Sequence, residues 1–176
     1  MRYCAIFTVL NAVSFTPVSA QDAPFGFAWG PVDKVPRPWT TQREANITSL
    51  YYDRSSPVSA AEDTEQVIVD VCKTEGLQQV VWVSRHLPPD ELVRKFQLAH
   101  RQGVERYGEA KQFAIPMTEA WQDGRVFLGV TQGAEGQQRL VMFIRGPLFD
   151  QCSAEHQTES GHPASLHFGN LMLRDN

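Results

Sequence analysis

The chain has 176 residues, of which 42% are hydrophobic and 20% charged. This length suits one domain, and the composition is typical of a soluble globular protein; it excludes a coiled coil, a collagen-like repeat and a disordered chain. The 16 Lys and Arg residues against 20 Asp and Glu residues give a net charge of −4. Nucleic acid is therefore not expected as a partner, because binding to its backbone needs clustered positive charge.

The first twenty residues predict a signal peptide. Arg2 is the only charge before Asp22, and an apolar run over Ala5–Phe15 is followed by small residues that end at Ala20. This run is too short to span a membrane, which needs about twenty residues. We expect cleavage after Ala20 and a periplasmic or secreted mature chain, residues 21–176, with no stable membrane insertion.

Export changes the interpretation of the cysteines. Cys4 leaves with the signal peptide, so Cys72 and Cys152 remain in an oxidising compartment, where an even count favours a disulfide. That bond would close a loop of 80 residues (152 − 72). The alternative is a nucleophilic or metal-binding thiolate at Cys152, which requires the disulfide to be absent.

The mature chain starts with an irregular, proline-rich stretch that contains one short candidate strand. Phe25, Phe27 and Trp29 alternate with small residues, so a strand here presents one aromatic face. Such a face is either buried in the core or a binding surface that stacks on carbohydrate. A second strand is predicted over residues 46–52, and its first residue, Asn46, begins a glycosylation sequon.

Alternating apolar residues predict four further strands, which form two hairpins with glycine-containing turns. The strands cover residues 65–72, 77–85, 125–131 and 139–145, and the second turn is Gly133–Gly136.

One long helix is predicted between these hairpins, over about residues 89–107. It begins with proline and acidic residues and ends near Gly108, as helix termini favour. Its apolar stripe, at spacings of three and four, is Leu92, Phe96, Ala99, Gly103 and Tyr107. The expected fold is therefore α+β: an antiparallel sheet built from two hairpins plus N-terminal strands, covered on one face by this helix, with a polar C-terminal tail.

One cluster of chemistry-bearing side chains lies near the end of the chain. Imidazole, thiolate and carboxylate groups are ligands of zinc and copper, so a metal site is one interpretation. The other is a polar tail with surface histidines. The candidate ligands are His156, His162 and His167, with Cys152 and with Glu155 or Glu159.

Known catalytic motifs do not occur: the chain has no Gly-x-Ser-x-Gly elbow, no phosphate-binding glycine-rich loop and no His-Glu-x-x-His. The sequence therefore favours a non-enzymatic binding module without a cofactor, whose partner is another envelope or secreted protein. One alternative is a metal-binding protein or metal-dependent enzyme that holds zinc or copper at the C-terminal cysteine and histidines. A further alternative is an inhibitor of a secreted enzyme, which would use an exposed loop, 53–64 or 131–138.

Overall fold

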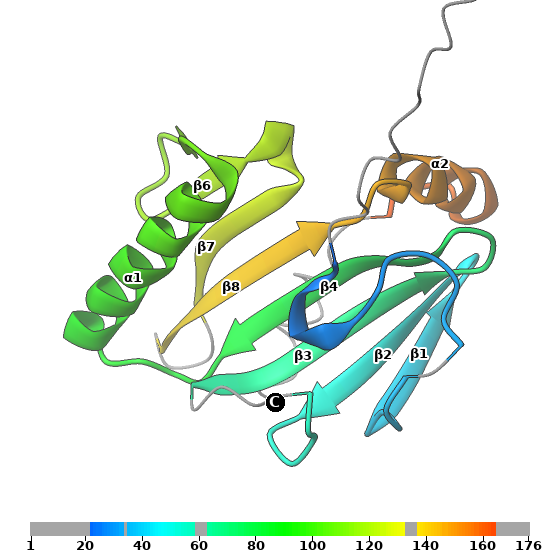
Figure 1. Ribbon diagram of the computed structural model, residues 1–176, viewed down its shortest axis with the longest axis horizontal. Helices are drawn as coiled ribbons and strands as arrows, with labels where there is room; N and C mark the ends of the chain where they lie inside the picture. The colour runs from blue at the N-terminus through cyan, green and yellow to red at the C-terminus, as the bar shows by residue number, and fades with distance from the viewer. Residues whose placement is uncertain (1–21, 34, 59–62, 133–136, 165–176) are drawn as a thin grey trace, which may run out of the picture.

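The computed structural model describes residues 22–33, 35–58, 63–132 and 137–164, and these form an eight-stranded antiparallel sheet with two helices (Figure 1). The strands run in the order β1-β2-β3-β4-β8-β7-β6-β5. They are β1 (Thr40–Glu44), β2 (Ile47–Asp53), β3 (Thr64–Cys72), β4 (Gly76–Ser84), β5 (Lys111–Gln112), β6 (Glu119–Trp121), β7 (Val126–Gln132) and β8 (Gln138–Arg145). The helices are α1 (Pro89–Tyr107) and α2 (Phe149–Ser160), and 3-10 turns cover Pro24–Gly26 and Gln122–Gly124. The predicted α+β class and antiparallel sheet are confirmed.

One face of the sheet carries both α1 and the segment that precedes β1 (Figure 1). Side chains on a strand alternate between faces, so residues paired across neighbouring strands share a face. Val80 and Trp82 of β4 pair with Ile144 and Met142 of β8 and lie on this covered face. A second buried cluster, on the opposite face, comprises Tyr51, Ile68, Val81, Val83, Val141 and Phe143.

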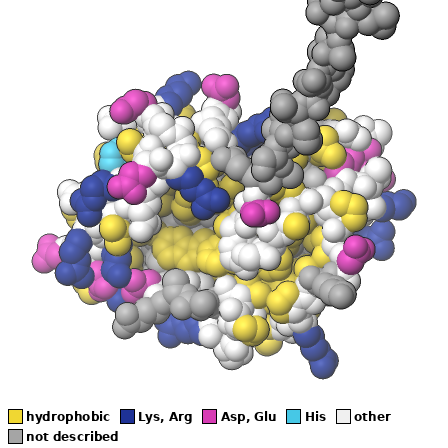
Figure 2. Space-filling model, viewed as in Figure 1, with side chains coloured by type: hydrophobic (Ala, Val, Ile, Leu, Met, Phe, Trp, Pro, Cys, Tyr) yellow, Lys and Arg dark blue, Asp and Glu magenta, His cyan; other side chains and the backbone are white. Residues whose placement is uncertain are grey.

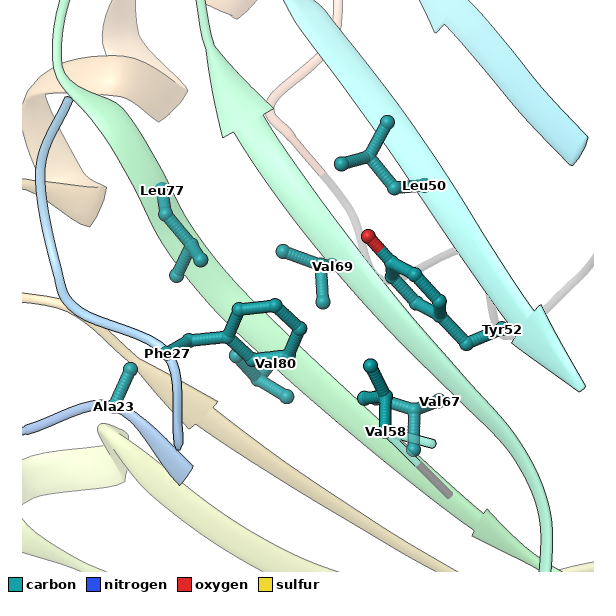
Figure 3. Packing of buried hydrophobic residues seen from close by; sticks show 9 residues of the cluster. All are labelled: Ala23, Phe27, Leu50, Tyr52, Val58, Val67, Val69, Leu77 and Val80. Carbon is teal, nitrogen blue, oxygen red and sulfur yellow. The ribbon is translucent and has the colours of Figure 1, made fainter. Parts of the chain in front are cut away.

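The segment before β1 closes one half of the covered face (Figure 3). Phe27 is buried there, with its ring centroid 6.0 Å from that of Tyr52 on β2. Large aromatic rings remove much apolar area from water, which favours this packing. The cluster comprises Ala23, Phe27, Leu50, Tyr52, Val58, Val67, Val69, Leu77 and Val80.

The predicted strand over Phe25–Trp29 is wrong. Pro24–Gly26 forms a 3-10 turn in which Phe25 has a φ of 62°, and this left-handed conformation is incompatible with a strand. The three aromatic side chains therefore do not share a face. Phe27 is buried, Trp29 is partly buried against the same cluster, and Phe25 is 39% exposed.

α1 covers the other half of the face, with the residue range that its sequence predicts. Phe96, Ala99 and Tyr107 pack against Trp121 of β6 and Leu128 of β7. The helix ends at Tyr107 and is followed by Gly108, whose φ of 87° suits glycine. The apolar stripe thus faces the sheet as predicted.

Residues 149–160, predicted as part of an irregular tail, form α2 instead. Its buried side, Phe149, Cys152 and His156, faces the protein at spacings of three and four residues. Cys152 forms a disulfide with Cys72 at the end of β3, with 6.0 Å between the two Cα atoms. The predicted disulfide is confirmed, and it fixes α2 to the sheet.

Several predictions concern residues outside the described ranges. These are the signal peptide over residues 1–20, the turn at 133–136 and His167; the loops 53–64 and 131–138 are described only in part. Among the described helices, none combines the length and the apolar composition that crossing a membrane demands.

Candidate functional site

A groove of about 310 Å³ opens on the covered face of the sheet, between α1 and the segment before β1 (Figure 2). Val80 and Trp82 of β4 and Met142 and Ile144 of β8 line it, and the pairing of these strands sets them side by side. Figure 2 shows a hollowed patch of hydrophobic side chains in the middle of the face. Concave, mostly apolar sites of about 300–1,000 Å³ are typical of ligand pockets.

The walls of this groove come from α1 and from the 3-10 turn. Ala99, Gly103 and Tyr107 line it on the helix side, and Pro24 and Phe25 line it opposite. The left-handed backbone of Phe25 is unfavourable for a non-glycine residue, with a typical cost of about 1 kcal/mol or more. That conformation sets the ring beside the groove, where it is 39% exposed, while Phe27 enters the core.

Positive charge borders the apolar surface. Arg106 is exposed at the groove, and its guanidinium carbon lies 5.5 Å from the ring centroid of Tyr107. No salt bridge joins Arg106 to a carboxylate in the part of the chain that the structure describes. Burial raises the pKa of the Tyr107 hydroxyl, which therefore stays neutral at neutral pH. The groove thus combines an apolar floor with an available cation.

Trp82 offers the groove its apolar ring and no free hydrogen-bond donor. Its Nε1 donates to Oγ1 of Thr64 at 2.8 Å. A ligand that covers this ring consequently leaves no indole N–H without a partner.

Two of the three predicted histidines meet at another part of the molecule. The rings of His156 on α2 and His162 just after it have centroids 5.4 Å apart. Nε2 of His162 lies 3.3 Å from Oε1 of Glu44 on β1. One ligand atom of each of these three residues lies within 4.8 Å of the others, and neither Glu155 nor Glu159 belongs to this cluster.

The disulfide decides the role of Cys152. Its sulfur is bonded to Cys72, so it supplies no thiolate ligand or nucleophile. Its carbonyl oxygen accepts a hydrogen bond of 3.1 Å from Nδ2 of Asn46, which is only 2% exposed. The sequon amide is therefore internal in the folded protein, where it cannot carry a glycan.

A further polar cluster holds the fold together. Asp63, before β3, pairs with Arg85 at 3.1 Å and with Lys95 of α1, and Arg85 also pairs with Glu91 at 2.7 Å. The hydrogen bond from Lys95 and the charges of Lys95 and Arg85 hold the pKa of the Asp63 carboxyl below its usual value, against the opposing effect of burial. These contacts connect the start of α1 to the sheet.

Ser84 lies two positions before His86 in the sequence, and its hydroxyl has a structural role. Its hydroxyl donates to the carbonyl of Arg85 at 2.7 Å and accepts from the amide of Leu140 at 2.9 Å. This buried hydroxyl is occupied in joining β4 to β8.

Sequence patterns did not reveal the groove or the place of Glu44 in the histidine cluster. Both depend on side chains that only the pairing of distant segments brings together. The available signal for the groove was the pair of small residues, Ala99 and Gly103, on the apolar stripe of the helix, because small side chains leave space beside the sheet. Comparison of the chain with known protein families, with curated proteins and with solved structures found no match.

Proposed function

We propose that this protein is an exported, non-enzymatic binding module that holds an amphipathic anion in the groove beside α1. The observation that carries the proposal is the combination of an apolar floor, which includes Trp82 and Met142, with Arg106 among the lining residues. The Cys72–Cys152 disulfide supports the periplasmic or secreted location, because such bonds persist in oxidising compartments.

The ligand chemistry follows from the two kinds of surface. An alkyl chain gains about 0.8 kcal/mol for each methylene group that the floor takes out of water. A guanidinium group binds carboxylate or phosphate through paired, charge-assisted hydrogen bonds. A molecule with an apolar body and one anionic group therefore satisfies both Trp82 and Arg106.

The composition of the groove supports binding rather than catalysis. Its described lining has no carboxylate, histidine, cysteine or serine, the groups that serve most often as bases and nucleophiles. The described residues that line it are Pro24, Phe25, Val80, Trp82, Ala99, Gln102, Gly103, Arg106, Tyr107, Met142 and Ile144.

Calorimetric titration of the tag-free protein with a medium-chain fatty acid and with the matching alcohol tests the proposal. The fatty acid should bind with one ligand per protein and should change the fluorescence of Trp82. Arg106→Gln should weaken binding of the fatty acid about fivefold, as expected for a contact of about 1 kcal/mol. It should leave the affinity for the alcohol unchanged. Arg101→Gln, on an exposed position of the same helix, is the matched control.

A second variant tests the position of the ligand. Ala99→Phe should fill the groove from α1 and abolish binding of both compounds, while circular dichroism shows an intact fold. Absence of binding to the unmodified protein, or equal binding by Ala99→Phe, would overturn the proposal. An envelope or secreted partner offers the same chemistry where an apolar side chain lies beside an acidic one. Tighter binding of a short apolar-acidic peptide than of the fatty acid would assign the groove to such a partner instead.

A further inference from the structure

The cluster of Glu44, His156 and His162 lies outside the groove, where the edge strand β1 meets α2 and the turn that follows α2. The three side chains line a cavity of about 10 Å³. This volume has room for a single water molecule or ion, and not for a larger ligand. Asp70, a buried residue of β3, lines the same cavity and adds a carboxylate to its surroundings.

The spacing within the cluster is that of metal ligands. Two ligand atoms bound tetrahedrally to zinc, each at about 2.1 Å, lie about 3.4 Å apart. Nε2 of His162 and Oε1 of Glu44 are separated by 3.3 Å. His156 is within 4.8 Å of both through one ring nitrogen, so a small movement brings a third ligand into place.

Asn46 orients the ring of His156. Its Nδ2 donates to the carbonyl oxygen of Cys152, which leaves Oδ1 facing Nδ1 of His156 at 3.2 Å. An amide oxygen only accepts hydrogen bonds, so Nδ1 of His156 carries a proton, and a metal ion would bind through Nε2 of the neutral form of the ring. Histidine ligands of metals commonly donate their second N–H in this way, which fixes the tautomer and the ring direction.

We infer that Glu44, His156 and His162 form a site for one divalent transition-metal ion, such as zinc, with a fourth position open to solvent or to a further ligand. Two imidazoles and one carboxylate are a donor set that zinc accepts with three protein ligands. Hard cations such as magnesium prefer oxygen ligands only. The bound ion would join β1 to α2 beside the disulfide.

Calorimetric titration of the tag-free, oxidised protein with zinc chloride tests this site, with elemental analysis of the dialysed complex. The protein should bind one equivalent of zinc, and an excess of magnesium should not displace it. His162→Ala and Glu44→Gln should each weaken binding at least tenfold, the lower end of the range for loss of a supporting group alone. Both side chains are about half exposed, 53% for His162 and 45% for Glu44, so these variants keep the fold.

Two matched controls separate this site from general binding by surface histidines and carboxylates. Glu159→Gln changes an exposed carboxylate of α2, and His100→Gln removes a histidine that is paired with Glu119 elsewhere. Both should bind zinc as the unaltered protein does. Zinc should also raise the melting temperature of the unaltered protein and not that of His162→Ala. Less than one tenth of an equivalent of bound zinc, or equal affinity in His162→Ala, would show that no such site exists.

Discussion

Gly103 of α1 lies directly against the indole of Trp121, so that a Cβ atom on residue 103 would be 2.5 Å from Cζ2 of that ring. An alanine at an open helix position normally stabilises by about 1 kcal/mol relative to glycine. Here Trp121 is 1% exposed and has no room to retreat, so we expect Gly103→Ala to destabilise the protein by about 1–3 kcal/mol. Thermal unfolding measures the change, with Gln97→Ala on the exposed side of α1 as the control. A higher melting temperature for Gly103→Ala would contradict this packing.

Loss of the disulfide should destabilise the folded protein strongly. The disulfide closes a loop of 80 residues, which should add about 4 kcal/mol to the free energy of unfolding because it restricts the unfolded chain. The Cys72→Ala, Cys152→Ala double variant should therefore unfold at a lower denaturant concentration than the oxidised protein. The mass of the unaltered protein should also rise by that of two hydrogen atoms on reduction, because each sulfur gains one proton and one electron. An unchanged unfolding midpoint would mean that the bond does not constrain the unfolded chain.

The ion pairs of Asp63 predict a loss of stability in acid. Its pKa is lower in the folded than in the unfolded chain, chiefly because of the hydrogen bond from Lys95. The folded chain thus binds fewer protons at this site. The resulting stability is present above the unfolded pKa of about 3.9 and is lost as the pH falls through the folded pKa.

Asp63→Asn should accordingly be less stable than the unaltered protein at pH 7, by about 1 kcal/mol or less for ion pairs of this exposure. The difference should shrink as the pH falls below about 4, where the carboxylate takes up its proton. Denaturant titrations at several pH values measure both effects, and Asp33→Asn, at an exposed position, is the control. A difference independent of pH would assign the effect to packing instead.

Glu75, in the turn between β3 and β4, has a buried carboxylate. It is 5% exposed, and both carboxylate oxygens lack a hydrogen-bond partner among the residues that the structure describes. A buried polar group without a partner costs about 1–3 kcal/mol. Glu75→Met keeps the chain length and removes the carboxylate, so it should raise the free energy of unfolding. The same change at exposed Glu105 should have little effect, and a loss of stability in Glu75→Met would reveal a favourable role for this carboxylate.

The elements that were predicted correctly are those whose burial repeats along the chain. Val67 and Val69 of β3 face the covered side of the sheet and alternate with Ile68, which packs in the cluster on the opposite side. The stripe from Leu92 to Tyr107 follows the helical period. The disulfide followed from the cysteine count together with the expected compartment. For the strands and the helix, a local pattern of apolar residues carried the information.

The elements that were missed lack such a pattern. β1 is an edge strand with four exposed residues, so its sequence shows no apolar alternation. The buried side of α2 includes Cys152 and His156, which hydrophobic periodicity does not count as core residues. The turn at Phe25 depends on a left-handed backbone that an aromatic residue rarely adopts, and tertiary packing of Phe27 overrides the alternating pattern.

The pairing of β4 with β8 has a consequence for how the molecule assembles. Among the described strands, β1 to β4 follow one another in the sheet and so do β5 to β8, so β4–β8 is the seam between two locally connected halves. Distant pairings of this kind form slowly, because a long chain segment must be closed first. The floor of the groove crosses the seam, with Trp82 on one side and Met142 on the other. A ligand that contacts both residues would bind only when the two halves of the sheet are paired, and it would therefore stabilise the folded sheet.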